Sequence, residues 1–96
     1  MPSVTWSPRA LRDLERFREF LEPKSEQAAQ RAALLIRDAV RHLANTPQMG
    51  RLTEGLLPGF RELIIQFGRG AYIVRYHFDG KRLLILSLRH SRETED

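Results

Sequence analysis

The sequence predicts an α+β fold in the order β-α-α-β-β-β, in which a helical hairpin packs on a small antiparallel sheet. Two observations support this prediction. Apolar residues recur at helical spacing across residues 8–45, interrupted at Pro23. Three runs rich in β-branched and aromatic residues follow over residues 59–90, separated by turns that contain glycine. With 96 residues the chain is expected to form a single domain, residues 1–96.

A short strand and two helices are expected in the first half of the chain. Residues 3–6 are β-branched and aromatic, which predicts an edge strand. Ser7 and Pro8 then mark a helix start, because serine caps well and proline at the first helical position loses no needed hydrogen bond. This helix stops before Pro23, and a second helix is expected over residues 25–43. Few residues join the two helices, so they should form an antiparallel hairpin.

Three strands are expected after a loop, at residues 60–67, 71–78 and 82–89, as an antiparallel meander. The turns between them contain Gly68-Arg69-Gly70 and Asp79-Gly80, and Asp-Gly is a strong hairpin signal. The middle strand should bury the stripe formed by Tyr72, Val74 and Tyr76. Strict alternation on the last strand places on one face Leu84, Leu86, Leu88 and His90, and on the other Leu83, Ile85, Ser87 and Arg89.

Composition narrows the cellular setting and the kind of partner. There is no cysteine, no apolar run near the ~20 residues of a membrane span, and no signal-peptide pattern at the N-terminus. We therefore expect a cytoplasmic protein that makes no membrane contact. The net charge is +4, and residues 51–92 hold eight cations against three acids, so the predicted sheet region is basic. A basic sheet favours an acidic partner surface or a phosphate backbone, although solubilising surface arginines remain an alternative.

An ordered set of residues across nearly the whole chain resembles a known family. The set comprises Trp6-Ser7, Ala10, Asp13-Leu14, Pro47, Gly50-Arg51, Gly59, Arg61-Glu62, Tyr72, Tyr76 and Arg89-His90-Ser91-Arg92. In this order and at this chain length it resembles the RelE/ParE toxin superfamily of bacterial type II toxin–antitoxin modules. The resemblance implies the β-α-α-β-β-β fold and a toxin that causes growth arrest. It also implies a cognate antitoxin, a small DNA-binding protein, that neutralises the toxin in a hetero-oligomer.

The family contains two kinds of toxin. RelE-like members are ribosome-dependent mRNA endoribonucleases that use no metal. ParE-like members are not nucleases, and poison DNA gyrase by binding it. Metal-free RNA cleavage needs a base, an acid and cations around one phosphate. The residues that could supply them in a nuclease are Arg61, Arg75, His90 and Arg92.

Three departures from the RelE-like pattern favour the ParE-like branch. Ile64 and Ile65 stand where those nucleases often carry lysines, and Ile73 follows Tyr72 where they commonly have an arginine. The tail after Arg92 is acidic, without a tyrosine or histidine. We therefore predict a gyrase inhibitor that is not an enzyme and has no cofactor or metal. The alternatives are a RelE-like nuclease acting on ribosome-bound mRNA, and a small non-toxic RNA- or protein-binding domain.

Two binding surfaces are predicted from residue placement. A target-binding surface is expected at strand ends rich in cations, formed by Arg75, Arg89, His90 and Arg92. An antitoxin-binding surface is expected at an apolar groove, through helix-in-groove recognition or strand addition, at Phe17, Phe20, Leu21, Leu56 and Leu57. Structural roles remain the alternatives: burial in the monomer for these five apolar residues, packing for His77 and His90, and helix capping or ion pairing for Arg51.

Overall fold

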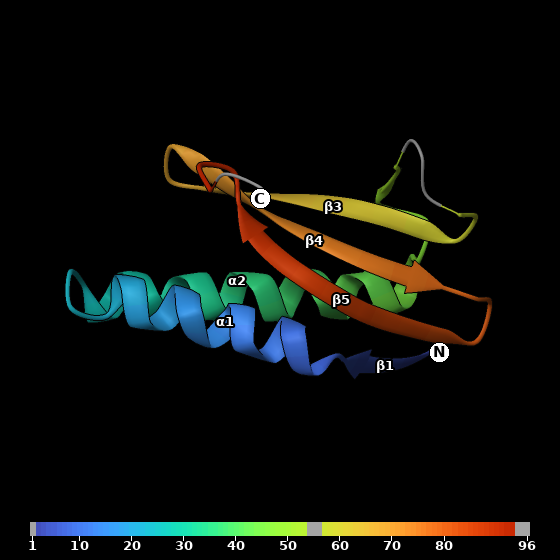
Figure 1. Ribbon diagram of the computed structural model, residues 1–96, viewed down its shortest axis with the longest axis horizontal. Helices are drawn as coiled ribbons and strands as arrows, with labels where there is room; N and C mark the ends of the chain where they lie inside the picture. The colour runs from blue at the N-terminus through green and yellow to red at the C-terminus, as the bar shows by residue number, and fades with distance from the viewer. Residues whose placement is uncertain (1, 54–56, 94–96) are drawn as a thin grey trace.

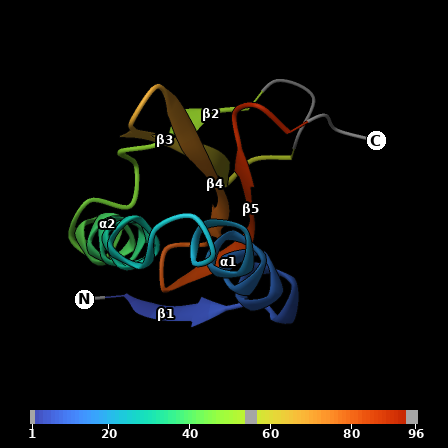
Figure 2. The same cartoon turned by 90° about the vertical axis from the view of Figure 1, so that its left-hand side faces the viewer.

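The computed structural model describes residues 2–53 and 57–93. Its elements are β1 (Ser3–Trp6), α1 (Pro8–Leu21), α2 (Glu26–Asn45), β2 (Arg51–Leu52), β3 (Phe60–Phe67), β4 (Gly70–Phe78) and β5 (Arg82–His90). The strands form one sheet in the order β1-β5-β4-β3-β2, and the helices lie along one face of it (Figure 1). Seen end-on, the helices lie side by side, with β3, β4 and β5 above them and β1 passing beneath (Figure 2).

The predicted α+β class with a helical hairpin on a sheet is confirmed, with two corrections to the sheet. First, the sheet is mixed, since β1 pairs with β5 in parallel. The connection from β1 to β5 runs through both helices and through β2, β3 and β4, and parallel pairing requires a long connection of this kind. Second, the segment expected to be a loop contains the two-residue strand β2, which pairs antiparallel with β3.

The helix starts follow the predicted capping chemistry. The Ser7 hydroxyl accepts a hydrogen bond from the Ala10 backbone N–H at 3.0 Å, and the Ser25 hydroxyl accepts one from Ala28 at 3.1 Å. Each cap satisfies one of the N–H groups that a helix leaves without an internal partner. None of the described helices is long and apolar enough to cross a membrane.

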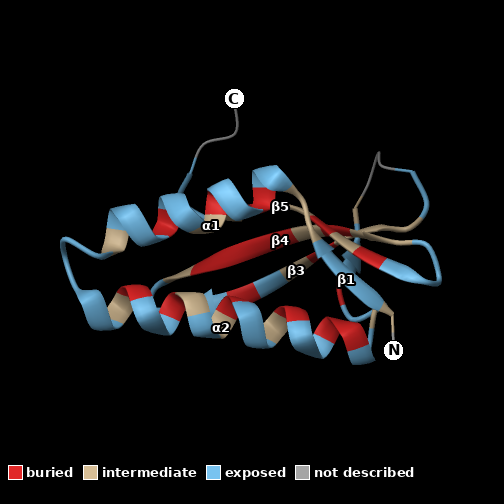
Figure 3. Cartoon of the chain, turned by 90° about the horizontal axis from the view of Figure 1, so that it is seen from below, coloured by how far each residue is buried: buried red, intermediate tan, exposed pale blue. Residues whose placement is uncertain are grey.

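The core lies between the helix pair and the sheet, and Figure 3 shows its buried positions along the facing sides of both layers. It contains the predicted stripe of β4, with Tyr72, Val74 and Tyr76 all buried. The helices contribute a run of buried residues with helical spacing. These are Ala10 and Phe17 from α1, and Ala29, Ala32, Ile36, Val40 and Leu43 from α2.

A β-bulge on β5 changes which side chains face the helices. Arg75 pairs with Ser87 but the next residue, Tyr76, pairs with Ile85, so Leu86 has no partner on β4. Leu88 and His90 therefore share the helix side with Leu83 and Ile85, and the predicted strict alternation along this strand is wrong. An extra residue in one strand reverses the inside–outside pattern of everything after it.

Side chains from α1 satisfy the backbone groups that the bulge frees. The Ser7 hydroxyl donates to the Leu86 carbonyl at 2.8 Å, and the Leu88 N–H donates to Asp13 Oδ2 at 2.9 Å. Asp13 is a buried acid, only 9% exposed, and it also pairs with Arg16. These contacts fix α1 on β5, so Ser7 and Asp13 serve the fold directly.

Candidate functional site

The loop after α2 is held in place by two side chains of the sheet. The Tyr76 hydroxyl donates to the Pro47 carbonyl at 2.7 Å and accepts from the Gly50 N–H at 2.9 Å. Arg61 donates to the carbonyls of Gln48 and Gly50. A Cβ at Gly50 would lie 2.6 Å from the Tyr76 hydroxyl and 2.8 Å from a backbone oxygen, so only glycine fits this approach. Four residues of the family-like set, Pro47, Gly50, Arg61 and Tyr76, therefore hold one loop in place.

Replacing Tyr76→Phe should lower the free energy of unfolding by about 1–3 kcal/mol, because the buried Gly50 N–H and Pro47 carbonyl lose their partner. Burial raises the pKa of Tyr76, so its contribution is complete below the unfolded pKa of about 10 and is lost as pH rises above it. Urea unfolding at pH 7 and at alkaline pH measures both effects. The variant should lose less stability at alkaline pH than the wild type does, and an equal loss would contradict the role given to Tyr76.

The helix-free face of the sheet carries a row of charges centred on a buried acid. Glu62 is only 4% exposed and accepts from Arg75 through Nε at 3.2 Å and Nη2 at 2.9 Å. Arg51 lies across it from β2, 3.6 Å from its other oxygen. A buried carboxylate needs such partners to offset desolvation. The guanidinium of Arg75 is therefore engaged in the sheet, and Arg51 pairs with an acid instead of capping a helix.

The structure places the four nuclease candidates on different faces. Arg61 is opposite Tyr76 and His90 is opposite Tyr72, so both lie on the helix side of the sheet. Arg75 lies on the helix-free face with Glu62. Arg92 follows β5 in the terminal turn. The residues that a phosphate-cleaving site would need around one atom are thus not gathered there.

His90 is packed against other side chains at the end of the sheet. Its ring meets Tyr72 edge-on with 5.2 Å between centroids, and a Cβ on Gly70 would lie 2.7 Å from His90 Cε1. Its Nδ1 accepts from the Arg92 N–H at 3.2 Å. Glu93 accepts from the His90 N–H and pairs with Arg16 at 2.7 Å, which holds the terminal turn against α1.

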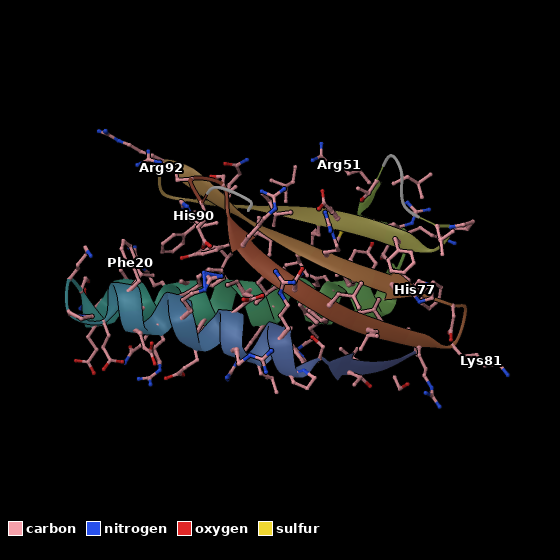
Figure 4. The ribbon with its side chains drawn as sticks, in the orientation of Figure 1. Phe20, Arg51, His77, Lys81, His90 and Arg92 are labelled. Carbon is pink, nitrogen blue, oxygen red and sulfur yellow. The ribbon has the colours of Figure 1, made fainter. Side chains whose placement is uncertain are left out.

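The two histidines of the sheet lie near opposite ends of β4 (Figure 4). His77 stacks on Phe60 with 4.6 Å between ring centroids. It is five residues along the strand from Tyr72, the partner of His90, which corresponds to about 17 Å. They therefore cannot serve one proton-transfer site. No group of three or more potential metal ligands occurs within residues 2–53 and 57–93.

The five predicted antitoxin contacts do not form one surface. Phe17 is buried and stacks on Tyr72, and Leu21 packs against the core. Phe20 is 63% exposed, with the Lys24 ammonium 3.7 Å from its ring centroid, and Leu57 is 75% exposed. Leu56 lies outside the described residues. Of the four members that the structure describes, only Phe20 and Leu57 are exposed, and they come from the hairpin tip and from the segment before β3.

Two residues of the predicted target-binding surface, Arg75 and Arg89, do lie on the same face of the sheet. Ile73 pairs with Arg89 on one side and with Ile64 on the other, so all three lie on the helix-free face with Arg75. Ile64 is partly exposed there.

Sequence reasoning missed the roles of Asp13 and Glu62. A buried acid inside an otherwise apolar pattern was the available signal, but the sequence did not identify its partners.

Comparison with known proteins gives a consistent result. A family model described as the ParE toxin of the type II toxin–antitoxin system parDE matches residues 4–95. Toxin RelE2 of Caulobacter vibrioides is 36% identical over 91 residues, covering 95% of this chain and 97% of that protein. Toxin RelE3 of the same organism is 36% identical over 93 residues, covering 97% and 98%. A chain of the chromosomal ParDE system of P. aeruginosa shares the fold, with a TM-score of 0.75 at 22% identity, covering 96% and 98%.

Proposed function

Because this chain belongs to the ParE toxin family of type II toxin–antitoxin systems, we propose that it binds DNA gyrase and traps the cleaved-DNA intermediate. The toxin itself would break no bond, and replication forks would meet DNA held open by gyrase. Family membership also supplies the partner, a cognate antitoxin. Since gyrase acts on chromosomal DNA, the proposal places the toxin in the cytoplasm.

The observation that carries this proposal is the separation of the nuclease candidates. General acid–base cleavage requires groups within hydrogen-bond reach of the same reacting atoms. Arg61 donates hydrogen bonds to the loop after α2, and Arg75 donates to Glu62. His90 packs against Tyr72. The arginine positions that resemble the family set therefore support a binding surface over a catalytic one.

The helix-free face near the end of β5 is the proposed contact with gyrase. It combines Ile64, which is 43% exposed, with Arg89, and Ile73 between them is buried at 8% exposed. Arg92 lies in the adjoining turn. Apolar side chains beside arginine are typical of the energetically important centre of a protein interface. A surface that only followed a phosphate backbone would instead be dominated by cations.

A second candidate function is ribosome-dependent mRNA cleavage. It is favoured by His90, which stands between Arg89 and Arg92 in the sequence and suits proton transfer near neutral pH. In this case the ring would have to leave its packing against Tyr72 and Gly70 to reach an mRNA phosphate.

Expression of the chain without its antitoxin in a bacterial host should arrest growth and produce double-strand breaks in the chromosome. Co-expression of the antitoxin, as the matched control, should relieve both effects. Mapping of mRNA ends in the same cultures should reveal no cuts positioned by codons. Arrest with codon-positioned cuts and an intact chromosome would establish the nuclease instead, and normal growth would indicate a non-toxic binding domain.

A further inference from the structure

We propose that two copies of this chain associate through the open edge of β3, so that their sheets join across a two-fold axis at Ile65 and α2 of one copy packs beside α2 of the other. The proposal goes beyond the proposed function and does not depend on which target the toxin has. It concerns residues 63–67, a border of the sheet that carries none of the predicted site residues.

β3 is a border strand over most of its length (Figure 1). Among the described strands, β2 pairs with β3 only at Arg61 and Glu62, whereas β4 pairs with all of residues 60–67. Alternate residues of an antiparallel strand direct their backbone N–H and C=O groups away from the neighbouring strand. From Leu63 to Phe67, β3 therefore offers a row of backbone donors and acceptors to the strand of another chain.

This open segment, Leu63-Ile-Ile-Gln-Phe67, lacks the features that keep sheet borders apart. It contains no charged residue and no proline, and its register with β4 is continuous, without a bulge. One of its isoleucines, Ile64, is 43% exposed. An uncharged apolar border strand favours pairing with another chain. The next question is which chain fits this edge.

The open segment of β3 is complementary to a second copy of itself. Antiparallel pairing about Ile65 sets Leu63 opposite Phe67 of the second copy. On the other face of the sheet it sets Ile64 opposite Gln66 of the second copy, so no like charges meet. After this segment the chain turns toward β4, and the row of β3 ends where β2 of the second copy would begin. The two short β2 strands therefore continue the row at each end instead of colliding with it.

α2 lies beside the same edge and runs antiparallel to β3. Near its start, Arg31 lies over the ring of Phe67, with 5.9 Å from the guanidinium carbon to the centroid. Figure 2 shows α2 on the side of the molecule where β3 lies, and α1 on the side of β5. From Arg31 to Leu35 the helix advances about 6 Å, which equals about two residues of a strand. Leu35 therefore lies level with Ile65, the centre of the proposed strand pairing.

The side of α2 that borders this edge is also self-complementary. Arg31, Leu35 and Asp38 follow one another at i, i+4 and i+7, and both charged residues are exposed. Leu34, next to this stripe, is 62% exposed. In an antiparallel helix pair about Leu35, Arg31 of each copy meets Asp38 of the other. The strand and the helix thus indicate the same two-fold axis, which favours a second copy of this chain as the occupant.

Sedimentation velocity of the purified toxin over a range of concentrations measures this association. The sedimenting mass should rise from the 11.2 kDa of one chain toward twice that value. Arg31→Glu sets two acids together and Asp38→Arg sets two arginines together, so each should weaken dimerisation by at least roughly tenfold. The control Arg37→Glu makes the same charge change on the side of α2 that shares a pocket with β1, and should weaken it less than about threefold.

A mixture of the two single variants tests the symmetry directly. In a mixed dimer the introduced glutamate meets the introduced arginine, and the unaltered Asp38 meets the unaltered Arg31. The mixture should therefore dimerise about as strongly as the wild type, although each variant alone does not. A toxin that stays monomeric at every concentration would overturn the proposal, and so would equal dimerisation of the wild type and both single variants.

Hydrogen exchange at residues 63–67 tests the strand pairing itself. These amides should exchange more slowly as the toxin concentration rises, and Gln66→Lys, which adds a charge to the border strand, should remove this protection. Protection that appears only when antitoxin is added, without self-association of the toxin, would assign the edge to a strand of the antitoxin and refute the dimer. None of these measurements involves gyrase, so a negative result here leaves the proposed function standing.

Discussion

Reversing the charge of Arg89 and Arg92 together, as Arg89→Glu with Arg92→Glu, should abolish inhibition of gyrase supercoiling. Arg89 lies on the helix-free face opposite Ile73, and Arg92 follows in the terminal turn. Interface arginines carry a disproportionate share of binding energy, and a carboxylate in the same place adds repulsion toward an acidic partner. We expect the concentration needed for half-inhibition to rise by more than roughly a hundredfold, measured by relaxation and supercoiling of plasmid DNA.

Two controls make this result interpretable. Lys81→Glu with Arg82→Glu changes the net charge equally at exposed positions at the opposite end of β5 and should inhibit gyrase as the wild type does. Because Arg89 also makes an interaction within the fold, the thermal unfolding midpoint of the Arg89→Glu/Arg92→Glu variant must be measured as well, and it should stay within a few degrees of the wild type. If the folded variant still inhibits gyrase, the helix-free face is not the surface that binds it.

Replacing Asp13→Ala should lower the free energy of unfolding by about 2–4 kcal/mol. The substitution leaves the Leu88 N–H buried without an acceptor and removes one of the two acidic partners of Arg16, the other being Glu93. It also detaches α1 from the bulge that sets the register of β5. Urea unfolding followed by circular dichroism measures the change.

Two further variants separate these contributions of Asp13. Asp13→Asn keeps an acceptor for Leu88 while losing the charge, so it should cost less than the alanine variant. Asp38→Ala removes an exposed acid of α2 that pairs with Arg41 at 3.6 Å, and should change stability by no more than about 0.5 kcal/mol. Equal losses for Asp13→Ala and Asp38→Ala would show that the bulge does not depend on the buried carboxylate.

Local signals in the sequence were sufficient for the helical hairpin and the meander. Ser7 and Ser25 cap helices through contacts three residues away, and turns at Gly68 and Gly80 are also local. The bulge at Leu86 was not predictable in this way, because its compensation comes from α1, 79 residues distant for Ser7 and 75 for Asp13. The parallel pairing of β1 was missed for the same reason, since the order of strands depends on how the crossover packs.

The sequence indicated which residue types occur in the sheet region, but not which faces of the sheet their side chains occupy. Arg61, Arg75 and Arg89 lie within strands of the sheet, but the face that each occupies depends on the register of its strand. One inserted residue moves His90 to the helix side and Arg89 to the helix-free face. The open edge of β3 was missed because it depends on how far β2 extends and on where α2 lies, and no single stretch of sequence displays either.

The most direct test of the central claim is the reaction of purified toxin with purified gyrase and supercoiled plasmid, in parallel with ribosomes translating a defined mRNA. Detergent and protease treatment of the gyrase reaction should release linear plasmid that requires ATP-competent gyrase and disappears when the antitoxin is added first. The mRNA in the parallel reaction should remain intact. Intact plasmid together with mRNA cut at defined codon positions would contradict the account and assign the toxin to the nuclease branch.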